Sequence, residues 1–308
     1  MKVVCFDKWQ PEAKEILKNH LTFEGGHNFA DSIGFISRLN WKVTTELLDD
    51  MPKLRFVASC TTGLDHIDVD YCKRRGIEII SLQGETDLLR DVWATAEHTW
   101  ALILSLVRRI PWAFDDVKQG SWERERWQGS ELRGKTLGIV GYGRVGQQVA
   151  RFAEAFGMRV AIYDPYYRNC DQGFYGTANT YSGLEGLLRT ADIITVHVPL
   201  TDETKNMFGY EQFAQMKSSV MLINTSRGLI INETDLLAAL KNKAIAGAAL
   251  DVLQNEPNVN PEFIRYAKEN TNLLLTCHLG GNTQESRKAT QCFIASKIRG
   301  FIENEQTY

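Results

Sequence analysis

Residues 136–164 read TLGIVGYGRVGQQVARFAEAFGMRVAIYD, and this stretch decides the fold. An apolar run, TLGIV, leads into Gly141, Gly143 and Gly146 in the spacing GxGxxG, and a helical stretch follows. In a strand-helix-strand unit the first glycine permits a tight turn, the second lets the backbone approach a pyrophosphate, and the third lets helix and strand pack closely. The pattern predicts a dinucleotide site at the N-terminus of this helix.

The second apolar run of this stretch, RVAIYD, ends in Asp164. An acidic residue in this place accepts hydrogen bonds from the hydroxyls of the adenosine ribose and repels a 2'-phosphate. No arginine or lysine follows Asp164 before Arg168. The sequence therefore favours NAD over NADP.

The same alternation of apolar and amphipathic runs extends in both directions. Strands are predicted at KVVCF, GFIS, LRFVASC, IEIISL, DIITVHVP, VMLINTS, AIAGAALDV and NLLLT, and helices at PEAKEILKNH, TTELLDDM, DVDYCKRRG and TQESRKATQCFIASKIRGFIENE. Gly76, which follows three cationic residues, is expected to end a helix. With 308 residues and 44% hydrophobic content, the chain can form two α/β domains, each a doubly wound parallel sheet.

Residues 91–110 form a long apolar helical pattern at which we place the crossover between the domains, with Pro111 as its stop or kink. The next stretch, residues 111–132, carries Trp112, Trp122 and Trp127 among dense charges. It is interpreted as an excursion over the surface that could mark a subunit contact, or as aromatic residues covering the edge of their own domain.

Composition excludes several classes of partner. The 35 basic and 38 acidic residues are mixed along the chain, so neither a nucleic acid nor a membrane surface is an expected partner. No signal peptide or membrane span is evident, which predicts a cytoplasmic protein. The six cysteines form no CxxC pair and are expected to be buried free thiols, with no metal site.

Three titratable or charged residues directly follow later predicted strands, where open α/β sheets place their ligands. They are Arg227 in LINTSRGLI, Glu256 in LDVLQNEP and His278 in LLLTCHLGG. Reduction of a 2-keto acid needs a cation for the carboxylate and ketone, a proton donor near neutral pH, and a group that keeps this donor protonated. Arginine, histidine and glutamate suit these tasks.

Taken together, the motifs resemble the D-isomer specific 2-hydroxyacid dehydrogenase family, and within it the catalytic part of the D-3-phosphoglycerate dehydrogenases. The likeness runs from about residue 35 to about residue 286 and includes GYGRVG with Asp164, HVPLTDET, INTSRG, AALDVLQNEP, CHLGG, SCTTGLDHID and ATAEHT. It implies a Rossmann NAD-binding domain, residues 93–282, inserted in a flavodoxin-like substrate domain, residues 1–92 and 283–308. It also implies a homodimer that forms through residues 111–127.

The resemblance further implies a role for individual residues. Arg227 would bind the substrate carboxylate and carbonyl, His278 would be the general acid and base, and Glu256 would hydrogen-bond the far side of the imidazole. The cofactor residues would be Gly141, Gly143, Arg144, Val145, Gly146, Asp164, Val198, Pro199, Thr204, Thr225, Ser226, Asp251 and Gly280. The substrate-binding residues would be Arg38, Thr61, Thr62 and Gly63.

The motifs leave the particular 2-hydroxy acid open. Arg38 matches an arginine near the substrate phosphate of phosphoglycerate dehydrogenases, but Ser59 stands where those enzymes carry a second arginine, and no counterpart of their C-terminal regulatory domain is visible. Phosphoglycerate is therefore not favoured. Glu256 in place of glutamine disfavours formate dehydrogenase activity, and Thr62 in place of lysine disfavours phosphite dehydrogenase activity.

Some alternatives remain. An NAD-sensing binding protein, like the corepressors on this fold, would keep the same three catalytic residues, although no signal of a peptide-binding cleft is visible. Cys277, where the family usually has proline, is interpreted as a tolerated small residue rather than a redox site. His197 is expected to order the loop beside the cofactor, whereas His66 and His98 are placed in helical surroundings.

Overall fold

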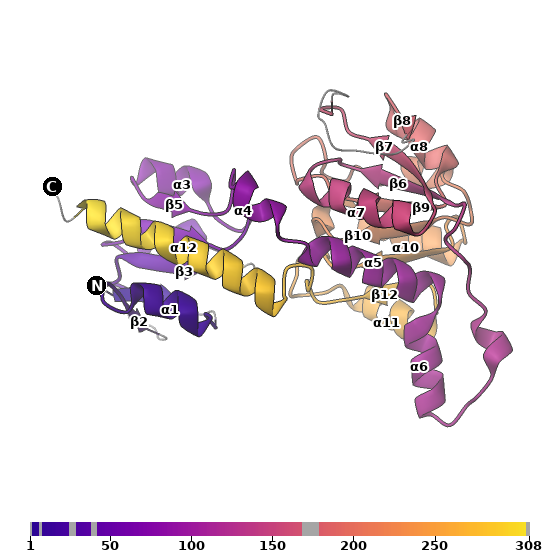
Figure 1. The fold of residues 1–308 in the computed structure, drawn as a ribbon, viewed down its shortest axis with the longest axis horizontal. Coiled ribbons are helices and arrows are strands. Elements are labelled where there is room, and N and C mark those ends of the chain that lie inside the picture. The colour runs from indigo at the N-terminus through magenta and orange to yellow at the C-terminus, as the bar shows by residue number, and fades with distance from the viewer. Residues whose placement is uncertain (1, 6–7, 25–28, 38–41, 168–178, 306–308) are drawn as a thin grey trace. The chain divides into compact units, whose positions relative to one another are not determined.

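The computed structural model describes residues 2–5, 8–24, 29–37, 42–167 and 179–305. The chain divides into two compact units, one of Met1–Val92 with Asn282–Tyr308 and the other of Trp93–Gly281. Each unit is a parallel sheet with helices on both faces (Figure 1). The predicted fold class is confirmed.

The first unit contains a five-stranded sheet in the order β2-β1-β3-β4-β5, the flavodoxin-like order. Its strands are β1 (Lys2–Cys5), β2 (Thr22–Glu24), β3 (Gly34–Ser37), β4 (Phe56–Ser59) and β5 (Glu78–Ile80). Its helices are α1 (Pro11–Leu17), α2 (Thr45–Asp49), α3 (Val69–Arg74), α4 (Thr86–Arg90) and α12 (Gln284–Glu305).

Side chains of this sheet alternate between two apolar cores. On β4, Phe56 and Ala58 pack in the core that α1 and α12 cover, while Val57 lies in the core that contains Leu48 of α2 and Cys72 of α3. Because both faces are buried, the strands consist of nearly continuous apolar runs. Gly76 follows α3 in the left-handed conformation, φ 67°, as its place after the cations predicted.

The second unit contains a seven-stranded sheet in the order β12-β11-β10-β9-β6-β7-β8. Its strands are β6 (Thr136–Val140), β7 (Arg159–Tyr163), β8 (Asn179–Thr180), β9 (Ile193–Val196), β10 (Met221–Asn224), β11 (Gly247–Leu250) and β12 (Leu273–Leu275). The chain leaves β6 toward β7 on one side and later returns to β9 on the other. The sheet therefore has a topological switch point between β6 and β9, where such sheets bind ligands.

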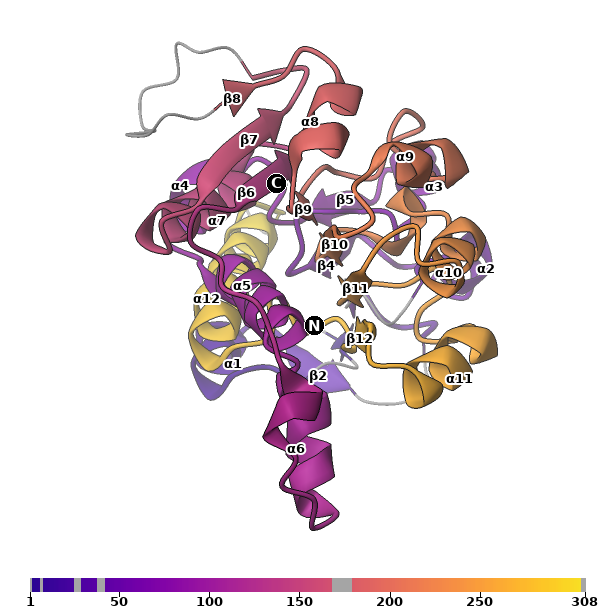
Figure 2. The same cartoon turned by 90° about the vertical axis from the view of Figure 1, so that its right-hand side faces the viewer.

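Helices cover both faces of this sheet as well (Figure 2). The helices of this unit are α5 (Ala94–Val107), α6 (Ile110–Lys118), α7 (Arg144–Ala155), α8 (Leu184–Thr190), α9 (Tyr210–Gln215), α10 (Glu233–Lys241) and α11 (Pro261–Glu269), with short 3-10 turns at Arg124–Trp127 and Gly228–Ile230. Helices α5 and α7 share one core with the sheet, and α8 to α11 share the other.

The prediction for Pro111 is corrected by the structure. Helix α5 ends at Val107, and the break is made by Arg109, which takes the left-handed φ of 54°. Pro111 lies in the first turn of α6, where its fixed φ favours a helix. Because N–H groups of a first turn have no acceptor within the helix, the missing N–H of proline removes no hydrogen bond there. The stretch after Pro111 thus begins with a helix that the charges and tryptophans of the sequence concealed.

Two smaller expectations also need correction. The five described cysteines are free thiols, but only Cys72 is buried, while Cys277 is exposed because it lies in the loop after β12. Cys170 lies outside the described residues. His66 lies in a turn before α3 rather than in a helix, whereas His98 is in α5 as expected. No helix within the described ranges is long and apolar enough to cross a membrane.

Candidate active site

The glycine-rich loop connects β6 to α7 at the switch point. Gly141 has a φ of 92°, and a Cβ there would lie 2.7 Å from the backbone of His197. A Cβ on Gly146 would lie 2.2 Å from the Gly141 carbonyl oxygen, whereas the space beside Gly143, which precedes the first residue of α7, is open. Two glycines therefore let segments pack closely, and the third leaves the helix N-terminus accessible to a phosphate.

Asp164 lies just after β7 and is fixed by the backbone. Its Oδ2 accepts a hydrogen bond of 2.8 Å from Tyr142 N in the glycine-rich loop, and its Oδ1 accepts one of 2.8 Å from Tyr166 N. A carboxylate oxygen can accept more than one hydrogen bond. Both oxygens of Asp164 therefore keep capacity for the hydroxyls of a ribose.

The segment after β9 forms the other side of the switch point. His197 follows β9, and its Nε2 is buried without a hydrogen-bond partner among the described residues. Burial lowers the pKa of His197 to about 3, so the ring is neutral in the folded chain. Val198 is buried, and the Thr204 hydroxyl donates to the Pro199 carbonyl at 2.6 Å, which gives the loop a fixed conformation.

Asn224, which ends β10, arranges the turn that leads to Arg227. Its Oδ1 accepts from Ser226 N at 3.0 Å and from Ser226 Oγ at 2.7 Å, and its Nδ2 donates to the Arg227 carbonyl at 2.9 Å.

Two further contacts fix the segment around this turn. Thr225 is buried, with its hydroxyl 2.8 Å from that of Thr99 on α5. A Cβ on Gly228 would overlap the Leu253 backbone, so this glycine lets the loops after β10 and β11 approach.

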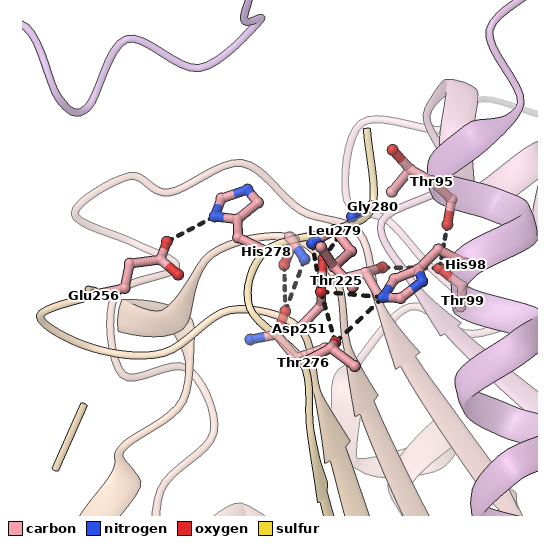
Figure 3. A network of polar contacts seen from close by, with 12 residues as sticks. Thr95, His98, Thr99, Thr225, Asp251, Glu256, Thr276, His278, Leu279 and Gly280 are labelled. Carbon is pink, nitrogen blue, oxygen red and sulfur yellow. Dashed lines mark hydrogen bonds and ion pairs between the residues drawn. The ribbon is translucent and has the colours of Figure 1, made fainter. Parts of the chain in front are cut away.

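Glu256 and His278 form a direct pair. His278 Nδ1 lies 2.8 Å from Glu256 Oε1, and the two side chains are 19% and 34% exposed (Figure 3). An ionised carboxylate only accepts hydrogen bonds, so Nδ1 carries a proton in this pair. Nε2 is then the nitrogen that can exchange a proton with another molecule.

Asp251, just after β11, holds the loop that carries His278. Its carboxylate accepts hydrogen bonds from Leu279 N at 2.7 Å, Gly280 N at 2.8 Å and Thr276 Oγ1 at 2.6 Å. Burial alone would raise the pKa of Asp251, but hydrogen bonds from His98, Thr276 and Leu279 lower it to about 2. Asp251 is 1% exposed, and the protein itself uses both of its oxygens (Figure 3).

A second buried carboxylate supports the segment before Glu256. Glu233, in the first turn of α10, accepts a hydrogen bond of 2.5 Å from Gln254 N, and the Gln254 side chain donates to the Ile231 carbonyl at 2.7 Å. Burial raises the pKa of Glu233, and the negative charge of Glu256 raises it further. Glu233 was not a candidate in the sequence, because a glutamate in the first turn of a helix is normally exposed.

The predicted substrate loop lies in the first unit. Ser59, which ends β4, is within 2.8 Å of the Thr61 hydroxyl and 3.2 Å of His66 Nε2, and the Thr61 hydroxyl donates to the Gly63 carbonyl at 2.8 Å. Thr62 lies between these anchors. Arg38 lies outside the described residues.

The second unit thus brings most of the predicted residues to one edge of its sheet. Strands β10, β11 and β12 are neighbours, and the loops at their carboxyl ends carry Arg227, Glu256 and His278. His98 and Asn224, like Glu233, organise loops of this edge through their side chains without having been candidates for a role there. A histidine inside a helix and an asparagine at the end of a strand gave no sequence signal of these contacts.

Comparison with known proteins shows the family to which the chain belongs. The family model described as "D-isomer specific 2-hydroxyacid dehydrogenase, NAD binding domain" matches residues 100–280. The chain belongs to the D-isomer specific 2-hydroxyacid dehydrogenase family. Residues 100–280 are its NAD-binding domain, and this confirms the expected cofactor. The open helix N-terminus at Gly143 and the fixed carboxylate of Asp164 fit that cofactor.

Relatives within the family differ in length. The D-3-phosphoglycerate dehydrogenase of Bacillus subtilis is 41% identical over 263 residues, which are 85% of this chain and 48% of the relative. The glyoxylate reductase of Aeropyrum pernix is 37% identical over 310 residues, which are 98% of this chain and 87% of the relative. The chain therefore spans about half the length of the phosphoglycerate dehydrogenases it matches.

A solved structure has a similar fold. The D-lactate dehydrogenase of Aquifex aeolicus, solved with NAD and lactic acid, superposes with a TM-score of 0.83 at 29% identity and covers 100% of this chain and 97% of its own.

Proposed function

We propose that this chain is an NAD-dependent dehydrogenase that reversibly reduces a small 2-keto acid to the D-2-hydroxy acid. The observation that carries the proposal is the 2.8 Å contact between His278 Nδ1 and Glu256 Oε1 at the carboxyl edge of the sheet. It leaves the other ring nitrogen to serve as acid or base. Because the chain belongs to a family of 2-hydroxyacid dehydrogenases, we propose that this pair acts in the reduction of a 2-keto acid.

Each reacting group has a proposed partner. When bound, NADH supplies the hydride equivalent that C2 of the keto acid needs. His278 donates the proton from Nε2 to the ketone oxygen in reduction and takes it back in oxidation. Arg227 pairs with the substrate carboxylate and polarises the carbonyl. Glu256 holds the Nδ1 proton and stabilises the imidazolium.

The cofactor contacts are proposed for the groups around the switch point. The backbone from Gly141 to Gly146 would hold the pyrophosphate, Asp164 the adenosine ribose, and the turn at Thr225 and Ser226 the nicotinamide half. The carboxylate of Asp251 is buried and both of its oxygens accept hydrogen bonds from the 276–280 loop. We therefore propose that Asp251 acts on the nicotinamide half by holding this loop in place. The roles of Thr61, Thr62 and Gly63 in carboxylate binding, and the cytoplasmic location, stay predictions.

The homodimer is proposed from helix α6, which extends away from the sheet of its unit (Figure 2). Ile110, Phe114 and Val117, spaced four and three residues apart, are 52%, 63% and 48% exposed, and Trp122 is 85% exposed. Such a stripe of large apolar side chains is typical of a protein interface. Light scattering of Phe114→Asp at micromolar concentration should show monomer where the parent shows dimer, and a monomeric parent would contradict the proposal.

The activity is tested with a panel of 2-keto acids: glyoxylate, hydroxypyruvate, pyruvate, 2-oxoglutarate and longer branched acids. Each is incubated with NADH, and loss of nicotinamide absorbance is recorded. We expect turnover of at least one acid and a D-configured product by chiral chromatography. An L-configured product would contradict the proposal, and tight NADH binding without any turnover would favour an NAD-sensing protein instead.

A further inference from the structure

The loop that carries His278 needs support from outside itself. His278 has a φ of 57°, a left-handed conformation that side chains with a Cβ rarely adopt. Such a residue keeps its conformation only where the surrounding structure fixes it. The source of that support therefore decides where the imidazole lies.

Asp251 supplies the contacts on both sides of His278. Its backbone carbonyl accepts from His278 N at 2.8 Å, and its carboxylate accepts from Thr276 Oγ1 before His278 and from Leu279 N and Gly280 N after it. The loop from Thr276 to Gly280 is thus wrapped around one buried carboxylate. Its position depends on how firmly this carboxylate is held.

His98 holds the carboxylate from the helix side. Its Nε2 lies 3.0 Å from Asp251 Oδ1 and 3.2 Å from Thr276 Oγ1, and its side chain is 18% exposed. Neighbouring residues of α5, among them Ala96 and Trp100, are buried in the core that this helix shares with the sheet. His98 therefore joins the loop to a helix that cannot easily shift.

The protons of this network can be assigned. Asp251, with its pKa at about 2, is ionised and only accepts hydrogen bonds. The Thr276 hydroxyl has one proton, which it donates to Asp251 Oδ1. Nε2 of His98 must therefore carry a proton to contact Asp251 favourably. This nitrogen is a donor and is not available as a base.

We propose that His98 is a positioning residue for His278: by donating from Nε2 to Asp251 it fixes the 276–280 loop and thereby the imidazole that faces Glu256 (Figure 3). The inference rests on the proposed function for its catalytic consequence. Its structural part, the link from His98 to the His278–Glu256 contact, can be measured without substrate or cofactor.

Three variants distinguish the loss of the hydrogen bond between His98 and Asp251 from the loss of side-chain packing at His98. His98→Leu removes the donor, and His98→Gln places an amide N–H where the imidazole N–H was. Glu97→Gln, at the exposed neighbour on the same helix, is the matched control. Thermal unfolding verifies that each variant folds. If His98→Leu does not fold, His98→Phe replaces it, because it also lacks a donor at this position and keeps a ring of similar bulk.

The first measurement uses ligand-free protein labelled with 15N-histidine. The Nδ1–H signal of His278 is assigned by its loss in His278→Gln. We expect this signal in the parent, in His98→Gln and in Glu97→Gln, and its loss to solvent exchange in His98→Leu. An unchanged signal in His98→Leu would overturn the inference, whatever the activity of the protein.

The second measurement is steady-state reduction with NADH and the best 2-keto acid. Displacement of a catalytic group by about 1 Å can cost on the order of 100-fold, so kcat of His98→Leu should fall about 10- to 100-fold. His98→Gln should recover most of that loss. An equal loss in both variants would contradict the role of the donor. If the parent itself turned over no acid, the proposed function would fail, and the NMR result would still decide the inference.

Discussion

His278 Nδ1 and Glu256 Oε1 lie 2.8 Å apart although 22 residues separate them in the chain. The contact is possible because β11 and β12 are neighbouring parallel strands, so the loops at their carboxyl ends meet. A carboxylate at this distance accepts the Nδ1 proton of the imidazole in a hydrogen bond and leaves Nε2 for another molecule. Several measurable consequences depend on this pair.

Glu256→Leu should lower kcat for keto-acid reduction. The variant removes the acceptor that holds the Nδ1 proton of His278, so the ring loses the contact that orients Nε2. The measurement is kcat and kcat/KM for reduction by parent and variant, with Glu269→Leu, at an exposed glutamate, as control. An unchanged kcat in Glu256→Leu would make Glu256 a turn residue.

Replacement of Asp164 should weaken the preference for NADH. Its two oxygens are fixed by Tyr142 N and Tyr166 N, and in the proposed function this carboxylate binds the adenosine ribose, where its negative charge would repel a 2'-phosphate. We expect the parent to prefer NADH to NADPH in kcat/KM, and Asp164→Ser to narrow that ratio. Equal kcat/KM values of the parent with NADH and NADPH would show that Asp164 does not select between the two cofactors.

His197 should make the protein sensitive to mild acid. Burial lowers its pKa from 6.5 to about 3, so the unfolded chain takes up a proton below pH 6.5 that the folded chain does not. The free energy of unfolding is therefore not reduced by His197 above pH 6.5. As pH falls from 6.5 toward 3, it decreases by about 1.4 kcal/mol per pH unit for this one proton.

The test is urea unfolding between pH 7 and pH 4 for the parent and His197→Leu. The variant should lose less stability over this interval, whereas His20→Gln, in the other unit, should follow the parent. Parallel pH curves for the parent and His197→Leu would mean that the ring is protonated in the folded state.

Glu233→Gln should stabilise the protein near neutral pH. Burial and the charge of Glu256 raise the pKa of Glu233, so the folded state binds its proton more tightly than the unfolded state and loses stability as pH rises above 4.5. An amide keeps the acceptor for Gln254 N without the charge. Denaturant unfolding at pH 7 measures the effect, and Glu233→Ala, which also removes the acceptor, should be less stable than Glu233→Gln.

Short-range patterns predicted most of the fold. Gly141, Gly143, Gly146 and Asp164 lie in one stretch of sequence, and each has a local conformational or charge requirement that limits its residue type. Apolar runs located the main strands of both sheets, because sheets buried on both faces require them. Helix α6 escaped prediction because Pro111 was interpreted as a stop or kink and the residues after it mix tryptophans with dense charges, as surface segments do.

The contacts that organise the site could not be predicted in this way. His98 and Asp251 are 153 residues apart, and Glu233 begins α10 whereas Gln254 lies in the loop after β11. A helical histidine or an acidic residue in a first helical turn has many ordinary explanations. Only the fold shows that these side chains hold the segments that carry Glu256 and His278.

His278→Ala tests the central claim most directly. The best 2-keto acid is reduced with NADH by parent and variant, and NADH binding is measured by fluorescence titration. Loss of an aligned general acid typically costs about 10² to 10⁴ in rate, so kcat should fall by that much. NADH affinity, which we propose depends on the glycine-rich loop and Asp164, should stay nearly unchanged. A His278→Ala protein with near-parent turnover would contradict the account.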